Sequence, residues 1–236
     1  TMMAMRHAAK SGLKTIGLVN VPDSTIAREA DAVLPTRAGP EIGVASTKAF
    51  TAQLTVLLCF AVALARAKGQ IDTARAEAIH SEIQGLPGLV GKALGLFDSI
   101  RPVAHQLSQA KSALYLGRGA LYPLALEGAL KLKELSYIHA EGFASGEMKH
   151  GPIALIEDGL PVVALLAADT VMTKASSNLR EASARGGKII LLSEARAVDE
   201  VDYASAVVTV PDVDPLLAPI LMAIPAQILD YLTAVE

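Results

Sequence analysis

The sequence has few of the residues that carry redox or metal chemistry. Its 236 residues include a single cysteine, Cys59, and no tryptophan. One cysteine excludes an internal disulfide and a metal site built from several thiolates. Because Cys59 lies within an apolar run, we expect a small, buried core residue in a reduced, cytoplasmic protein.

Charged residues are also sparse. They make up 19% of the chain, and the net charge of −3 provides no basic field for nucleic acid. The apolar content of 52% is enough for a substantial core in one large or two small α/β domains. A small phosphorylated ligand needs only a local group of donors, so the net charge does not exclude one.

No segment has the pattern of a membrane span or a signal peptide. The longest apolar run, residues 52–65, is interrupted by Gln53 and Thr55 and is shorter than the ~20 residues that a span requires. The first residues lack a charged region followed by an apolar one. We therefore expect no membrane association and a buried helix over about 47–68.

Short β-type runs alternate with helical patterns along most of the chain, which predicts an α/β fold with parallel sheets. Helices are expected at about 1–10, 24–30, 47–68, 122–139, 173–184 and 219–234. Strands are expected at about 14–19, 32–35, 112–116, 160–167, 188–192 and 206–210. Two further helices, 71–84 and 86–99, are expected to meet at a break near Pro87, and His80 and His105 in this helical linker are expected to be surface or packing residues.

The two ends of the chain repeat one another. Residues 9–16 parallel residues 184–190, and both segments are followed by a short apolar strand and a long helix with one glutamine. A duplicated α/β domain explains this pattern. The second copy has a full set of elements, whereas the first has only its later half, so we expect the chain to begin inside a domain.

The segment from Tyr122 to Pro152 combines ionisable and apolar residues more densely than any other. On the expected helix, Glu127, Lys131 and Glu134 share one face because residues three or four apart are neighbours. A carboxylate beside a lysine in a partly apolar wall can act as a general base, and His150 can be a second proton carrier. Ordinary ion pairs on a solvated amphipathic helix remain the alternative interpretation.

Five long motifs resemble the isomerase half of the glutamine–fructose-6-phosphate aminotransferase family, which is a pair of sugar-isomerase (SIS) domains. The similarity runs through essentially the whole chain. The motifs are Glu41–Thr51, Leu116–Gly119, Ala125–Glu134, Tyr137–Gly142 and Met148–Pro152.

This resemblance implies two tandem SIS domains, each a three-layer α/β sandwich with a parallel sheet, the first incomplete at its N-terminus. The implied division is 1–70 for the first domain, 71–108 for a helical linker and 109–236 for the second domain. The implied reaction converts fructose 6-phosphate and glutamine-derived ammonia to glucosamine 6-phosphate, without a cofactor or a metal.

The resemblance also assigns roles to individual residues. Glu134 matches the residue that moves a proton between C1 and C2 of the sugar, and Lys131 would keep its carboxylate ionised. His150 matches a histidine that assists ring opening from the neighbouring subunit, which implies a homodimer. Residues matching the sugar-binding site are Glu41, Val44, Ser46 and, as a supporting candidate, Lys149.

The second copy has a poor anion cradle, since residues 165–170 offer one hydroxyl and one carboxylate. We therefore expect one sugar phosphate per pair of domains, held in the first. The family's phosphate loop would precede Thr1, and its active-site lysine would follow Glu236.

Two other functions remain open. One is a stand-alone SIS enzyme, such as a sugar-phosphate deaminase or a deglycase that acts on sugar–amine adducts. The other is a non-catalytic protein that senses sugar phosphates, which would not need Glu134 or His150.

Overall fold

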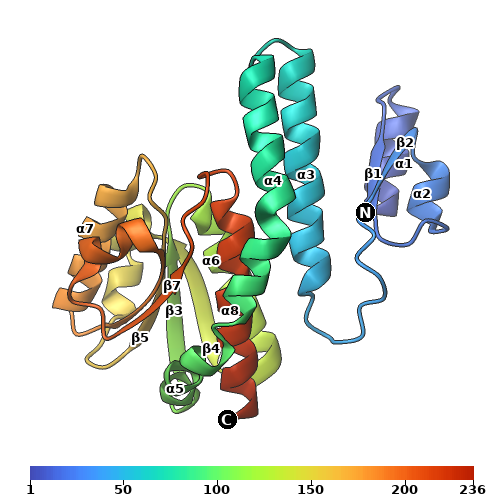
Figure 1. Cartoon of the computed structure of the whole chain (residues 1–236). Coiled ribbons are helices and arrows are strands. Elements are labelled where there is room, and N and C mark those ends of the chain that lie inside the picture. Colours follow the sequence, from blue (N-terminus) through green and yellow to red (C-terminus); the bar gives the residue numbers. More distant parts are fainter. The chain divides into compact units, whose positions relative to one another are not determined.

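A computed structural model describes residues 1–236 (Figure 1). The chain divides into two compact units, Thr1–Glu77 and Ala78–Glu236, and each is described by itself. The elements of the first unit are α1 (Met2–Lys10), β1 (Ile16–Val19), α2 (Thr25–Glu29), β2 (Ala32–Pro35) and α3 (Lys48–Ala67). Helix α4 (Thr73–Leu94) begins near the end of this unit and continues into the second.

The first unit contains a two-stranded parallel sheet, β1 beside β2. Asp31, just before β2, accepts hydrogen bonds from the Thr15 N–H and from Lys14 across the start of the sheet. The Lys14 bond is the main cause that lowers the pKa of Asp31 to about 2, and the bonds from Thr15 add to it. Ser24 accepts from the Ala27 N–H and so caps α2.

Two sequence predictions about α3 are wrong. None of its residues is buried, although we expected a buried helix, and Cys59 on this helix is exposed. Its apolar side chains are half-buried or, as at Leu57 and Leu64, exposed. The expectation that no segment has the pattern of a membrane span is also corrected, because α3 and α8 (Ala218–Val235) are both long and apolar enough by length and composition alone. Of the α8 window, 72% is buried inside the protein.

The second unit is built on a five-stranded parallel sheet in the order β4-β3-β5-β6-β7. Its strands are β3 (Ser112–Gly117), β4 (His139–Ala144), β5 (Pro161–Leu166), β6 (Lys188–Glu194) and β7 (Ala206–Val210). Its other helices are α5 (Phe97–Ser108), α6 (Leu121–Ser136), α7 (Met172–Ala184) and α8, with 3-10 helices η1 (Ser145–His150), η2 (Pro152–Leu155) and η3 (Ala195–Val201).

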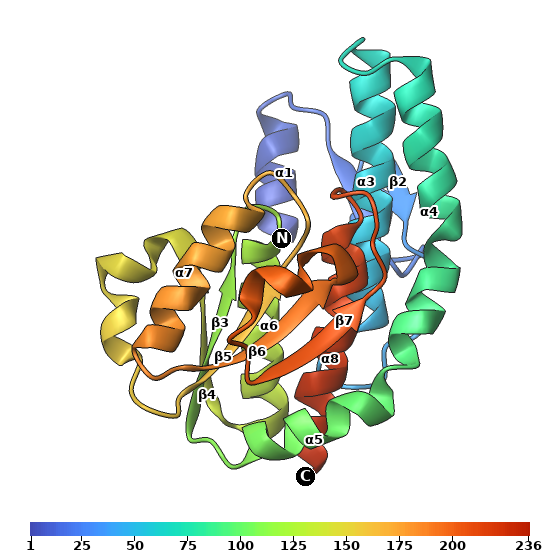
Figure 2. The same cartoon turned by 60° about the vertical axis from the view of Figure 1, so that its left-hand side comes forward.

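Helices cover both faces of this sheet (Figures 1 and 2). Helices α6 and α8 pack together on one face, and α7 packs against β5 and β6 on the other. The three central strands β3, β5 and β6 are almost wholly buried, as expected for a parallel sheet with two covered faces, whereas the edge strands β4 and β7 are only partly buried. Connections from β3 and β5 leave in opposite directions, so their carboxyl ends form a switch point where such folds bind ligands.

The helical linker differs from the prediction. We expected a break near Pro87, but α4 continues through it, and the chain turns at Gly95 instead. Pro87 is exposed, so the carbonyl that loses its helical partner can bind water. The carbonyl without a partner is that of Ile83, four residues before Pro87. Ile79 and Leu86, on either side of it, are buried and hold the helix in place.

The segment after α6 also differs. We expected a helix to His139 followed by a glycine-rich turn, but α6 ends at Ser136, with Tyr137 in the left-handed conformation (φ 63°). Residues 139–144 then form β4, which pairs with β3. A side chain at Gly142 would lie 2.8 Å from the Ala125 carbonyl oxygen, so glycine lets the strand pass close beneath α6.

The internal repeat is visible in the strand pairing. Ile16 pairs with Ala32 in the first unit, and Ile190 pairs with Ala206 in the second, at the same separation along the chain. Both pairs are parallel and both are followed by a long helix, α3 or α8.

Candidate functional site

Helix α6 starts where β3 ends, after the turn Gly117–Gly119. At Gly117 a side chain would lie 2.2 Å from the Leu121 carbonyl oxygen, so only glycine allows the helix to begin this close to the strand. Leu121, Leu124 and Leu132 are buried and hold the helix on the sheet. Glu127, Lys131 and Glu134 lie beside this buried face, and Lys131 is itself buried.

Glu127, Lys131 and Glu134 form the ion cluster that their spacing predicts. The Lys131 ammonium lies 2.5 Å from Glu134 Oε2 and 3.6 Å from Glu127 Oε1. Lys131 is only 5% exposed, whereas the Glu134 side chain is 33% exposed. A buried ammonium thus orients a carboxylate whose other side is open to solvent, which is the arrangement a general base needs.

His150 lies at the end of η1 and is exposed. Its Nδ1 is 2.8 Å from Glu147 Oε2, and its side chain is 73% exposed. No hydrogen bond or ion pair joins it to Glu134 within one chain. Lys149 pairs with Glu181 at 2.8 Å and so links η1 to α7.

The other predicted site residues belong to the first unit. Glu41 accepts hydrogen bonds from the Thr47 and Ala49 N–H groups and thereby caps the start of α3. Val44 is 94% exposed, and Ser46 is partly buried in the same loop. Within this unit the Glu41 carboxylate is bound to backbone N–H groups, whereas the Val44 side chain is open to solvent.

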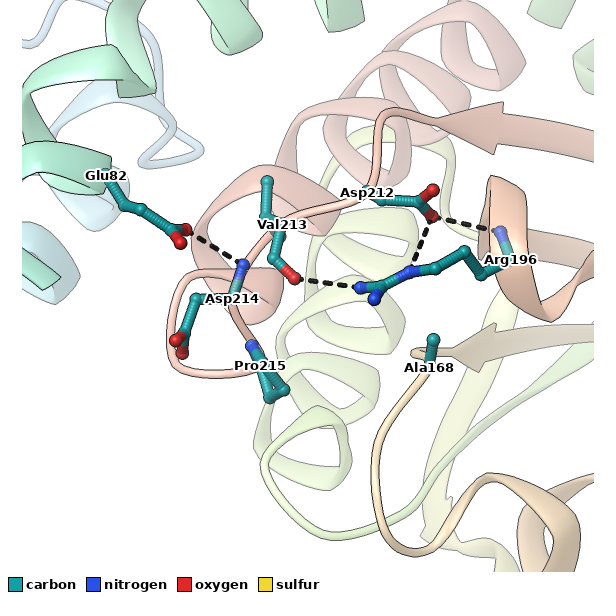
Figure 3. A pocket seen from close by; sticks show the side chains of 7 residues that line it. All are labelled: Glu82, Ala168, Arg196, Asp212, Val213, Asp214 and Pro215. Atoms are coloured by element: carbon teal, nitrogen blue, oxygen red, sulfur yellow. Dashed lines mark hydrogen bonds and ion pairs between the residues drawn. The ribbon is translucent and has the colours of Figure 1, made fainter. Parts of the chain in front are cut away.

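A cavity of about 570 Å³ lies at the carboxyl ends of β5, β6 and β7 (Figure 3). Glu194, at the end of β6, accepts from the Ala168 N–H at 2.7 Å and from the Val213 N–H at 2.9 Å. An internal carboxylate therefore occupies donors that an anionic ligand would use here. The cavity is lined by Glu82, Ala168, Arg196, Asp212, Val213, Asp214 and Pro215.

Two charged side chains of this cavity pair with each other. Arg196 binds the Asp212 carboxylate through its Nε at 3.3 Å and donates to the Val213 carbonyl oxygen (Figure 3). Glu82 accepts from the Asp214 N–H. Neither Glu194 nor Arg196 was identified from the sequence, since neither belongs to a recognised motif.

Sequence reasoning also missed a buried pair beneath α6. Tyr115 on β3 donates a short hydrogen bond to Asp230 on α8, and both side chains are 0% exposed. The available signal is that Asp230 is the one charged residue in a long, mostly apolar helix. The chain has no group of three or more His, Cys, Asp or Glu residues that could hold a metal ion.

Comparisons with known proteins agree with this architecture. Residues 1–63 and 106–236 match the SIS domain. The chain is 52% identical to the glutamine–fructose-6-phosphate aminotransferase [isomerizing] of Zymomonas mobilis and 50% identical to the Bradyrhizobium diazoefficiens protein of that name. Each alignment covers 100% of this chain and 39% of the relative. The chain thus spans about two fifths of the length of these curated relatives.

A solved structure gives the same result in three dimensions. The C-terminal domain of glucosamine-fructose-6-phosphate aminotransferase from Francisella tularensis matches with a TM-score of 0.97 and 40% identity, over 100% of this chain and 67% of that chain. The match to the SIS domain covers most of both units. This chain belongs to the SIS domain family.

Proposed function

We propose that this chain is the isomerase part of an enzyme that makes glucosamine 6-phosphate from fructose 6-phosphate and glutamine-derived ammonia. Identity of about half over the whole chain to curated aminotransferases of that name supports the proposal. The observation that carries it is the Lys131–Glu134 pair, in which a buried ammonium binds a carboxylate that is partly exposed to solvent.

The proposed chemistry is a proton transfer between neighbouring carbons. After ammonia forms an imine with the open sugar, Glu134 takes a proton from C1 and returns it to C2. Lys131 orients the carboxylate from one side, and the sugar approaches from the exposed side.

His150 has a separate role in this proposal. It assists opening of the sugar ring and comes from the partner subunit of a homodimer. Its exposure and its Glu147 partner support this role, because an accessible imidazole paired with a carboxylate can accept and release a proton.

The finer arrangement belongs to the same proposal. We infer two tandem SIS domains, 1–70 and 109–236, joined by a linker over 71–108, in a cytoplasmic enzyme. Glu41, Val44 and Ser46 line the sugar from the first domain, and Lys149 supports the site. The repeated strand pairing supports the tandem arrangement.

The test is Glu134→Gln in the full-length protein. We expect glucosamine 6-phosphate formation to fall by about 10²–10⁴-fold, the usual contribution of a general base, with fructose 6-phosphate affinity nearly unchanged. Lys133→Gln is the matched control, since Lys133 lies on the same helix and is exposed. Near-normal turnover in the Glu134 variant would refute the assignment, and sugar binding without any wild-type turnover would favour a sensor.

A further inference from the structure

Asp230 is a buried acid that the proposed mechanism does not use. It lies on α8 and is 0% exposed. Its Oδ1 accepts a hydrogen bond from the Tyr115 hydroxyl, whereas its Oδ2 is buried without any hydrogen-bond partner. A buried polar atom without a partner is costly, so its presence calls for an explanation.

Tyr115 ties Asp230 to helix α6. A side chain at Gly128 would lie 2.7 Å from the Tyr115 ring, so the ring fills the space directly beneath α6. Gly128 is one turn before Lys131 on the same helix. The Tyr115–Asp230 pair therefore lies under the part of α6 that presents Lys131 and Glu134.

The charged groups that act on Asp230 are Lys131 and Glu127, both on α6. Strand β7 has no ionisable residue, and Glu194 at the end of β6 binds the Ala168 and Val213 N–H groups. On α5, Arg101 and His105 pair with Glu236, more than one turn of α8 beyond Asp230. Lys131 is thus the cation that Asp230 shares with the candidate site.

Burial raises the pKa of Asp230 well above its usual value, while the Tyr115 hydrogen bond and the Lys131 charge lower it in part. The acid is therefore neutral under conditions in which surface aspartates are ionised. Burial, together with the Asp230 charge, likewise raises the pKa of Tyr115, which stays a neutral donor.

We propose that Asp230 is a positioning residue for the candidate general base, and that its protonation state sets how the Lys131 ammonium is shared between Glu134 and the interior. This proposal rests on the proposed function of Glu134. When Asp230 carries its proton, Lys131 is attracted only by Glu127 and Glu134 and stays 2.5 Å from Glu134. When Asp230 loses that proton to solvent, a third carboxylate competes for the same ammonium from beneath the helix.

The direction of the pH effect follows from these two states. Raising the pH ionises Asp230, draws Lys131 inward and leaves the Glu134 carboxylate without its fixed partner. Turnover then falls on the alkaline side, while sugar-phosphate affinity stays constant because Asp230 does not touch the sugar. Asparagine has the shape of the neutral acid but cannot ionise.

The experiment compares the pH dependence of kcat and KM for wild type and Asp230→Asn in the full-length protein. We expect the pH at which kcat falls on the alkaline side to rise by about one unit or more, because asparagine cannot ionise. KM should stay unchanged. Superimposed profiles would overturn the proposal, because a merely structural Asp230 leaves the limb unaltered.

Tyr115→Phe provides a second variant should the asparagine protein fail to fold. It removes the hydrogen bond that lowers the pKa of Asp230, so the limb again moves to higher pH. An unchanged limb in this variant also contradicts the proposal. Failure of the proposed function is a distinct result, since Glu134→Gln would then retain its activity whatever the profile of the Asp230 variant.

Discussion

At position 128, helix α6 passes directly over the ring of Tyr115. An added Cβ would lie 2.7 Å from Cε1 and 2.8 Å from Cδ1 of that ring, and Tyr115 is fully buried. The ring has no room to move away, because its hydroxyl is bonded to Asp230. A single methyl group must therefore displace α6 or break the buried hydrogen bond.

We predict that Gly128→Ala lowers the free energy of unfolding by about 1–3 kcal/mol, the usual cost of overpacking a core. The measurement is denaturant unfolding. Gly91→Ala is the matched control, because Gly91 also lies inside a helix but has nothing within 4 Å of the added atom. Alanine there should be neutral or stabilise by about 1 kcal/mol, and equal effects at both positions would contradict this account.

Single residues differ in how far sequence can predict them. The shared face of Glu127, Lys131 and Glu134 follows from helix spacing alone, and the structure confirms it. The Tyr115–Asp230 bond joins residues 115 positions apart, and no local pattern reports such a pair. The placement of His150 near a sugar stays a prediction, since it depends on a partner subunit.

At the scale of elements, the strands of the second unit were predicted well because their apolar runs are uninterrupted. Strand β4 was missed because Glu141 and Gly142 interrupt its pattern, and its position is set by pairing with β3 and by close approach to α6. The sequence predicts a break in α4 at Pro87 because proline usually interrupts a helix. The helix continues because Pro87 is exposed, so water can bind the carbonyl that proline leaves without a partner. Sequence alone does not show this exposure, which depends on the tertiary fold.

The loops after β5 and β7 are held together by one side chain at the end of β6. Glu194 is 1% exposed and accepts from the Ala168 and Val213 N–H groups. We predict that Glu194→Ala lowers the free energy of unfolding by about 2–4 kcal/mol, because it leaves two donors unpaired that had bonded to a charged group. Thermal and denaturant unfolding measure this loss.

The matched control is Asp202→Ala, which removes an exposed carboxylate 3.5 Å from Arg180. Exposed ion pairs contribute about 0–1 kcal/mol, so this variant should unfold nearly as wild type does. Glu194→Gln should lie between the two, since it retains one acceptor oxygen. A Glu194→Ala protein as stable as the control would show that the loops do not depend on this carboxylate.

At the scale of the whole chain, each unit has a polar side chain at the end of a strand that binds the loop after the next strand, but the two side chains differ in charge. At the end of β1, Asn20 accepts from the Ala38 N–H and donates to the Gly39 carbonyl, as Glu194 at the end of β6 binds the loop after β7. Asn20 adds no negative charge, whereas Glu194 places one at the edge of the second sheet. This difference supports the expectation of one sugar phosphate per pair of domains, held in the first.

The homodimer proposed for the full-length protein can be tested by mixing two inactive variants. In the proposed two-fold symmetric dimer, each site would take Glu134 from one subunit and His150 from the other. A mixed dimer of Glu134→Gln and His150→Ala subunits then contains one site with both substitutions and one site with neither. The intact site combines Glu134 of the His150→Ala subunit with His150 of the Glu134→Gln subunit.

We predict that co-refolding equal amounts of the two variants restores roughly a quarter of wild-type activity, since about half of the dimers are mixed and each has one intact site. Each variant refolded alone serves as the control and should stay inactive. Within its own chain the His150 ring pairs with Glu147, and no hydrogen bond or ion pair joins it to Glu134. Mixed dimers that form, as shown by differently tagged subunits purified together, but have no activity would place His150 in the same site as its own Glu134.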